Sequence, residues 1–257
     1  ERTGFLMLRL YSAGKIIPNP RKAYRGGEDS YIVSSPTNST LAVADGVGGW
    51  ESKGVNPRAF ADEILIRTYE FIKSGENNPY FALEAGFEMT IQTGSSTVCI
   101  GKMTPDGVFR VANMGDSGFL IIRNQKILLQ SSEHQHQFNF PYQLGRNEYG
   151  EPHGEDRPHD AEIYQITLEE GDIVVMGSDG LLDNVWPKQI LEYVNQEPQN
   201  PIALAKGLAE IAYEQSQNKE NAVPFFHRAK EEGVIFGSYQ GGKEDDITVL
   251  VGIVNED

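Results

Sequence analysis

Aspartate residues stand at the tips of strongly apolar segments of this chain, and this arrangement constrains the fold more than any other feature. Asp45 follows LAVA, Asp116 lies between FRVANM and GFLII, Asp179 follows DIVVMGS, and Asp245 comes just before DITVLVGIV. Such apolar runs predict buried strands, and burial fixes the backbone of the residue at the tip. We therefore expect these carboxylates to hold defined positions at one edge of a sheet.

Carboxylates that converge in this way require a compensating cation. Two of them about 4 Å apart repel each other by roughly 4 kcal/mol when the effective dielectric constant is about 20. Asp45 and Asp179 follow strands and Asp245 precedes one, and in antiparallel neighbours the end of one strand lies beside the start of the next. Oxygen ligands without paired Cys or nearby His favour Mg²⁺ or Mn²⁺ over structural zinc. The pattern predicts a bound divalent metal.

Asp-Gly pairs also have a simpler interpretation as turns. Asp106–Gly107, in KMTPDGVFRV, is predicted to form a hairpin turn and is assigned no chemistry. The turn interpretation is equally open for Asp45–Gly46 and Asp179–Gly180 when each is taken singly. Their occurrence together, each after an apolar strand, favours the metal site.

The rest of the chain alternates between strand-like and helix-like segments. Short apolar runs bounded by Gly, Pro or Asn predict strands over 5–12, 30–34, 40–44, 96–103, 108–114, 119–123, 126–130, 161–167, 172–176 and 247–254. Helical spacing of apolar residues, with a proline near most of the starts, predicts helices over 56–74, 79–92, 186–196, 200–217 and 225–233. Two packed antiparallel sheets with helices outside would bury all of these faces. With no linker in the sequence, we expect one domain over residues 1–257.

Six motifs in this order resemble the metal-dependent serine/threonine protein phosphatases of type 2C, also called the PPM family. They are GEDS, DGVGGW, GSSTV, NMGDSG, GSDGLLDN and EDDIT, and they extend over nearly the whole chain. The resemblance implies an α+β fold, a four-layer α-β-β-α sandwich. The DGVGGW variant, FNFPYQLG and GGKEDDITV are most similar to the mitochondrial-type branch, which implies a mitochondrial location, with the cytoplasm as the alternative.

The resemblance also implies which residues bind metal. Asp45 matches the family's bridging carboxylate, and the carbonyl of Gly46 matches a ligand of one ion. Asp179 and Asp245 match ligands of the other ion. Asp116, together with Asp179, matches the ligands of a weaker third ion.

Further acidic and basic residues match supporting positions of the family. Glu28 and Asp29 match residues that hold the water shell of the metals. Asp246 is either an acceptor behind the ligands or a charge at a strand edge. Arg25, with Arg21 as the alternative, is the candidate for binding substrate phosphate, although a solvated surface arginine fits either position equally well.

The activity implied is hydrolysis of phosphoserine and phosphothreonine in proteins. A water molecule shared by two divalent cations loses a proton near neutral pH and attacks phosphorus directly, so no covalent enzyme intermediate is needed. Val47 stands where many relatives have a His that is a candidate proton donor, and Val47 cannot donate one. A pseudophosphatase that binds phosphoprotein, or a hydrolase of small phosphate esters, are the alternatives.

Composition limits the partners. A net charge of −15 without a basic stripe argues against nucleic acid and anionic membranes, and without an apolar run of about 18 residues we expect no membrane-spanning helix. We expect a monomer that acts on phosphoprotein. The chain begins at Glu1 without Met, which suggests a trimmed domain whose targeting segment is absent. The single cysteine, Cys99, is expected to be a small buried apolar residue.

Two histidines, His134 and His136, form an H-x-H pair that also has two interpretations. Metal binding is one, but histidine ligands would break the all-oxygen pattern, so we favour a polar loop.

Overall fold

Two five-stranded antiparallel sheets form the centre of the computed structural model, which describes residues 7–197, 199–234 and 241–257. The first sheet contains, in spatial order, β1 (Leu8–Ile17), β14 (Ile247–Glu256), β13 (Ile173–Gly177), β7 (Gly118–Arg123) and β8 (Lys126–Gln130). The second contains β12 (Glu162–Thr167), β6 (Val108–Met114), β5 (Val98–Met103), β3 (Thr40–Asp45) and β2 (Asp29–Val33).

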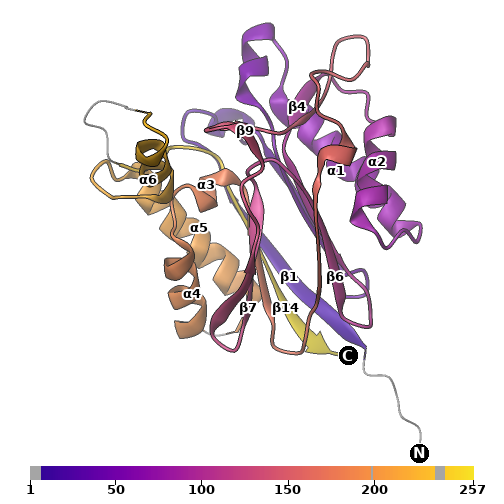
Figure 1. Ribbon diagram of the computed structural model, residues 1–257, viewed down its shortest axis with the longest axis vertical. Coiled ribbons are helices and arrows are strands. Elements are labelled where there is room, and N and C mark those ends of the chain that lie inside the picture. The colour runs from indigo at the N-terminus through magenta and orange to yellow at the C-terminus, as the bar shows by residue number, and fades with distance from the viewer. Residues whose placement is uncertain (1–6, 198, 235–240) are drawn as a thin grey trace, which may run out of the picture.

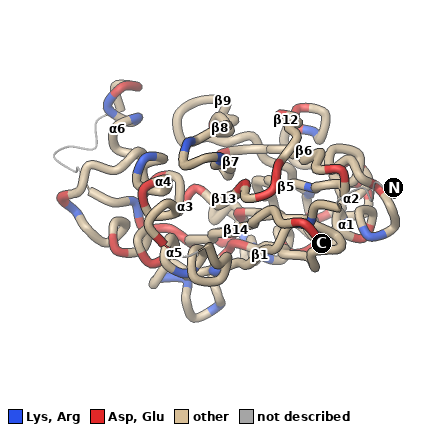
Figure 2. The backbone as a smooth tube through the Cα atoms, turned by 90° about the horizontal axis from the view of Figure 1, so that it is seen from below, with Lys and Arg blue, Asp and Glu red and all other residues tan. Residues whose placement is uncertain are grey.

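Helices cover the outer face of each sheet (Figure 1). Figure 2, turned by 90°, shows the same arrangement, with the sheets between two groups of helices. The helices over the second sheet are α1 (Pro57–Lys73) and α2 (Pro79–Met89). Those over the first are α3 (Asp179–Leu182), α4 (Pro187–Gln196) and α5 (Pro201–Gln217), and α6 (Pro224–Glu231) follows.

Alternation along the strands explains this layering. In β14, Val249 and Val251 face the helices, whereas Leu250 packs between the sheets. In β3, Ala42 packs against α1 and α2, and Val43 faces the other sheet. Successive side chains of a strand point to opposite faces, so each strand contributes to two of the three apolar layers. The predicted four-layer α-β-β-α sandwich is confirmed.

Apart from the short α3, which the sequence did not predict, the helices begin within one residue of their predicted starts, because short polar side chains and prolines define their first turns. Asn56, Asn78 and Asn200 each accept a hydrogen bond from a backbone N–H in the turn that follows. A proline comes directly after each of them, at a position whose N–H has no partner within the helix. No described helix combines the length and the apolar character that are needed to cross a bilayer.

Some strand boundaries differ from the sequence prediction. The first strand runs to Ile17, because it pairs with β14 along its full length; Phe5 and Leu6, where the prediction began, lie outside the described residues. The predicted strand over 96–103 is interrupted at Thr97, whose N–H donates to the carbonyl oxygen of Asp45 at 3.0 Å. The short strands β4 (Gly94–Ser96), β9 (Gln135–Gln137), β10 (Phe140–Pro141) and β11 (Leu144–Arg146) form two further small sheets.

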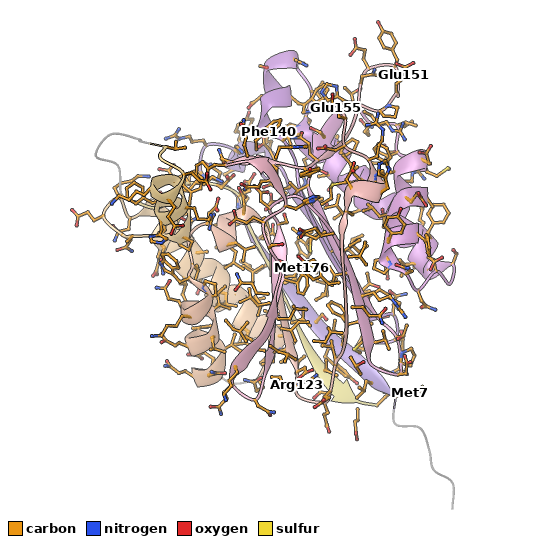
Figure 3. All side chains as sticks on the ribbon, in the orientation of Figure 1. Met7, Arg123, Phe140, Glu151, Glu155 and Met176 are labelled. Carbon is orange, nitrogen blue, oxygen red and sulfur yellow. The ribbon has the colours of Figure 1, made fainter. Side chains whose placement is uncertain are left out.

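One end of the sandwich holds the residues singled out by the sequence. Antiparallel pairing places Asp29 opposite Asp45, and it places Gly177, at the end of β13, opposite Val249 near the start of β14. Figure 3 shows this end near Phe140, with Arg123 at the other end of the sheets and Met176 between them. The two sheets thus deliver their carboxylates to a common edge.

Candidate metal centre

The acidic residues at this edge line one pocket of about 270 Å³. Asp45 is the last residue of β3, Asp116 lies in the turn between β6 and β7, Asp179 begins α3, and Asp245 lies two residues before β14. The pocket wall contains all the residues expected to bind metal, together with one residue expected to support them: Asp45, Gly46, Asp116, Asp179, Asp245 and Glu28.

Glycine follows two of these aspartates because other backbone segments pass close by. A Cβ atom on Gly46 would lie 2.7 Å from the carbonyl oxygen of Pro57, and a Cβ atom on Gly180 would clash with the carbonyl of Asp246. Gly107 also has a backbone segment close by, at the carbonyl of Leu168, but its φ of +85° and the hydrogen bond from its N–H to the Thr104 carbonyl are those of a turn. The hairpin predicted at Asp106–Gly107 is confirmed.

Asp246 is an acceptor behind the pocket and not a charge at a strand edge. Its side chain is almost fully buried and accepts hydrogen bonds from the backbone N–H of Asn19, at 2.7 Å, and of Glu28, at 2.8 Å. Asp29, also buried, accepts one from the Thr248 hydroxyl at 2.7 Å. The loop that carries Glu28 is therefore fastened to the start of β14.

Burial and mutual repulsion favour the neutral form of several carboxyl groups here. Burial, and then the charges of Asp29, Asp179 and Asp245, raises the pKa of Asp45 well above its usual value. Burial and the charge of Asp179 raise the pKa of Asp245 to about 7. Burial and the charge of Asp246 raise the pKa of Asp29 to about 8. A cation bound among them would lower these pKa values.

Lys243, which the sequence analysis did not single out, contributes a positive charge among these carboxylates. Its ammonium group lies 2.5 Å from Asp179 Oδ2, 2.6 Å from Asp183 Oδ2 and 3.5 Å from Asp245 Oδ2. Burial by itself would raise the pKa of Asp179, but the charge of Lys243 and the hydrogen bonds from Asp45 and Lys243 together outweigh it, and the pKa lies below its usual value. The sequence did hold a signal, because Lys243 is two residues from Asp245, and Asp183 is four residues, about one helical turn, after Asp179.

The donor atoms fit a hard cation. Every side chain of the pocket wall that the family resemblance assigns to metal binding offers carboxylate oxygens, the ligand atoms that Mg²⁺ and Mn²⁺ prefer. Within the described ranges, one oxygen of Asp29 and one of Asp179, both Oδ1, are buried without a hydrogen-bond partner, and such buried acceptors are costly unless a cation or donor satisfies them. No group of three or more His, Cys, Asp or Glu among these residues is already arranged to hold a metal. The carboxylates converge on one pocket without forming a finished ligand set.

Arg25, the candidate for phosphate binding, lies at the rim of the site. Its guanidinium group is 2.6 Å from Glu28 Oε1 and 2.6 Å from Glu51 Oε1. The alternative, Arg21, has an 82% exposed side chain and lies 3.7 Å from Glu244. Lys22, also missed from the sequence, lines the pocket itself and pairs with Glu28.

The H-x-H pair has a structural role outside the pocket. The rings of His134 and His136 both stack on Tyr142, with centroids 3.8 and 3.7 Å away, and His136 Nε2 lies 2.8 Å from Asp156 Oδ1. These contacts organise the segment around β9 and β10, and His136 lies in β9 itself and not in a loop.

Comparison with known proteins places the chain in a family. A family model described as stage II sporulation protein E (SpoIIE) matches residues 35–254. A protein of Oryza sativa subsp. japonica described as probable protein phosphatase 2C 1 is 36% identical over 246 residues, which cover 92% of this chain and 72% of that relative. Two Arabidopsis thaliana relatives are longer, and the chain spans 52% and 60% of their lengths.

Solved structures agree with this placement. The X-ray structure of the photosystem II phosphatase PBCP has a TM-score of 0.88 at 34% identity, covering 96% of this chain and 99% of that one. The catalytic domain of the serine threonine protein phosphatase PstP, solved with two manganese ions, has a TM-score of 0.67 at 18% identity, with the same coverage; at that identity it shows the fold alone. The chain belongs to the protein phosphatase 2C family.

Proposed function

We propose that this chain hydrolyses phosphoserine and phosphothreonine in proteins and that two Mg²⁺ or Mn²⁺ ions are held in its acidic pocket. Asp45, the Gly46 carbonyl, Asp179 and Asp245 would hold them. The convergence of these residues on one pocket is the observation that carries the proposal. The protein phosphatase relatives support the reaction and the phosphoprotein substrate, and the manganese ions in the related fold support the cofactor.

When bound, the ions supply charge that offsets the phosphoryl oxygens and lowers the pKa of attacking water. The protein holds the residues around the ions in fixed positions. Asp246 fastens the loop of Glu28, and the Thr97 hydroxyl, which accepts a hydrogen bond from the Asp45 N–H at 3.3 Å, holds the end of β3 against the neighbouring strand. Fixed carboxylates pay little reorganisation cost when substrate binds.

Two residues, one in the pocket wall and one at its rim, bear on the substrate. Val47 lines the wall and has no proton to donate, so the leaving alkoxide must receive its proton from another group or from solvent. Arg25 lies near enough to the acidic pocket to pair with Glu28, and we assign it the substrate phosphate, which it would meet by exchanging a carboxylate partner.

The test is phosphate release from a phosphothreonine peptide in Mn²⁺, in Mg²⁺ or in EDTA. We expect activity with either metal, none in EDTA, and a loss of at least about a hundredfold in Asp45→Asn and Asp179→Asn, the scale of removing one essential polar group from an active site. Asp62→Asn, which alters an exposed carboxylate on α1, is the matched control and should retain activity. Full activity in EDTA, or in both site variants, would refute the proposal.

The retained carboxylates argue against a pseudophosphatase, which would bind the phosphopeptide without turnover in the same assay. Faster turnover of a small phosphate ester than of the peptide would indicate a hydrolase of small phosphate esters. The remaining predictions are one catalytic domain over residues 1–257, a monomer, and a mitochondrial location with the cytoplasm as the alternative. The DGVGGW motif supports the location.

A further inference from the structure

Lys243 places a partly buried ammonium group among the carboxylates of the pocket, and the proposed reaction does not use it. Its side chain is 18% exposed. The two carboxylate oxygens that it contacts most closely belong to Asp179, the first residue of α3, and to Asp183, the residue that follows its last turn. An ammonium group so placed forms charge-assisted hydrogen bonds with both.

The backbone of Lys243 is fixed independently of these ion pairs. Its N–H donates to Asn184 Oδ1 and its carbonyl accepts from Asn184 Nδ2, each at 2.9 Å. Asn184 is fully buried and also donates to the carbonyl of Gly180 at 2.9 Å. The ammonium group lies 4.9 Å from the centroid of the Phe225 ring, a further favourable contact for a cation. The position of Lys243 is therefore built into the fold.

Asp183 is held so that one of its oxygens remains for Lys243. Its Oδ1 pairs with Arg228, whose Nε lies 2.9 Å from Glu133 Oε1, and its Oδ2 accepts from Lys243. The two carboxylate oxygens of Asp179 also have different surroundings. Its Oδ2 accepts a hydrogen bond from Lys243, whereas its Oδ1 is buried without a hydrogen-bond partner among the described residues. One oxygen of Asp179 is thus committed to the lysine, and the other is available to a metal ion.

We propose that Lys243 is a tethered cation that replaces the third metal ion expected between Asp116 and Asp179. The proposal rests on the proposed function for the other two ions. An ammonium group and a divalent ion repel each other and compete for the same oxygens, so the lysine excludes a third ion from this side of Asp179. It also keeps Asp179 oriented without a third ion. The chain should therefore bind two ions, not three.

The test counts bound metal. The full chain is stripped with EDTA and dialysed against Mn²⁺, and bound manganese is measured by mass spectrometry and by titration calorimetry. We expect two ions in the wild type and three in Lys243→Met, which keeps an unbranched side chain one atom shorter and removes its charge. Lys243→Arg keeps the charge and should bind two ions. Lys206→Met, at an exposed position on α5, is the matched surface control and should also bind two.

Three ions in the wild type, or two in a Lys243→Met variant shown to be folded by circular dichroism, would overturn the inference and leave the proposed function intact. No bound ion in the wild type would overturn both. If Lys243→Met does not fold, the wild-type count decides: two ions support the inference, and three refute it.

Discussion

Replacement of Asp246 by alanine should destabilise the protein strongly, although Asp246 touches neither substrate nor, in our assignment, metal. Its carboxylate accepts two hydrogen bonds from buried backbone N–H groups, at 2.7 and 2.8 Å. A hydrogen bond to a charged group contributes about 1.5–3 kcal/mol, so two contribute about 3–6 kcal/mol to the free energy of unfolding. Removal of the charge also relieves repulsion with Asp29, so we expect a loss near 3 kcal/mol. At about 2–4 °C per kcal/mol for a domain of this size, Tm falls by roughly 6–12 °C.

Thermal unfolding followed by circular dichroism in EDTA measures this loss without a contribution from metal binding. Asp62→Ala is the matched control, because it removes a carboxylate from an exposed ion pair with Arg58, and such pairs contribute about 0–1 kcal/mol. Activity of Asp246→Ala in Mn²⁺ should fall as well, because the loop that carries Glu28 loses its attachment. An unchanged Tm in EDTA would refute the reasoning, since it would mean that water or another acceptor satisfies both N–H groups.

Three further predictions concern the interior. Cys99 is fully buried, and burial raises the pKa of its thiol. The native protein should therefore resist a thiol reagent that reacts completely with the chain in denaturant. Rapid labelling of the native protein would contradict the burial. Phe109→Ala, between the sheets, should lower the free energy of unfolding by about 3–5 kcal/mol in urea titrations, and a loss below 1 kcal/mol would contradict its packing. Gly101→Ala places a Cβ atom against the Phe109 ring and should lower the free energy of unfolding by about 1–3 kcal/mol. The loss should be smaller in a Phe109→Leu background, and equal losses in both backgrounds would exclude that contact as the cause.

The sequence predicted much of the fold because its signals are local. Val108–Met114 and Lys126–Gln130 are strands with the predicted bounds, since apolar side chains alternate or run on until a turn residue ends them. Prolines marked the first turns of the helices over 57–73 and 201–217 for an equally local reason. The break at Thr97 had no local signal, because it depends on a hydrogen bond to the distant Asp45.

For the site, the sequence by itself determined which carboxylates stand at the tips of strands and that antiparallel pairing would bring them together. Only the tertiary structure decided how their charge is compensated. The pairing of Lys243 with Asp179 and Asp183, and that of Arg25 with Glu28 and Glu51, depends on side-chain positions at ångström precision. The positions of strands along the chain follow from the apolar pattern of neighbouring residues. A Coulomb interaction depends instead on the distance between two atoms, and the packed sandwich alone sets that distance.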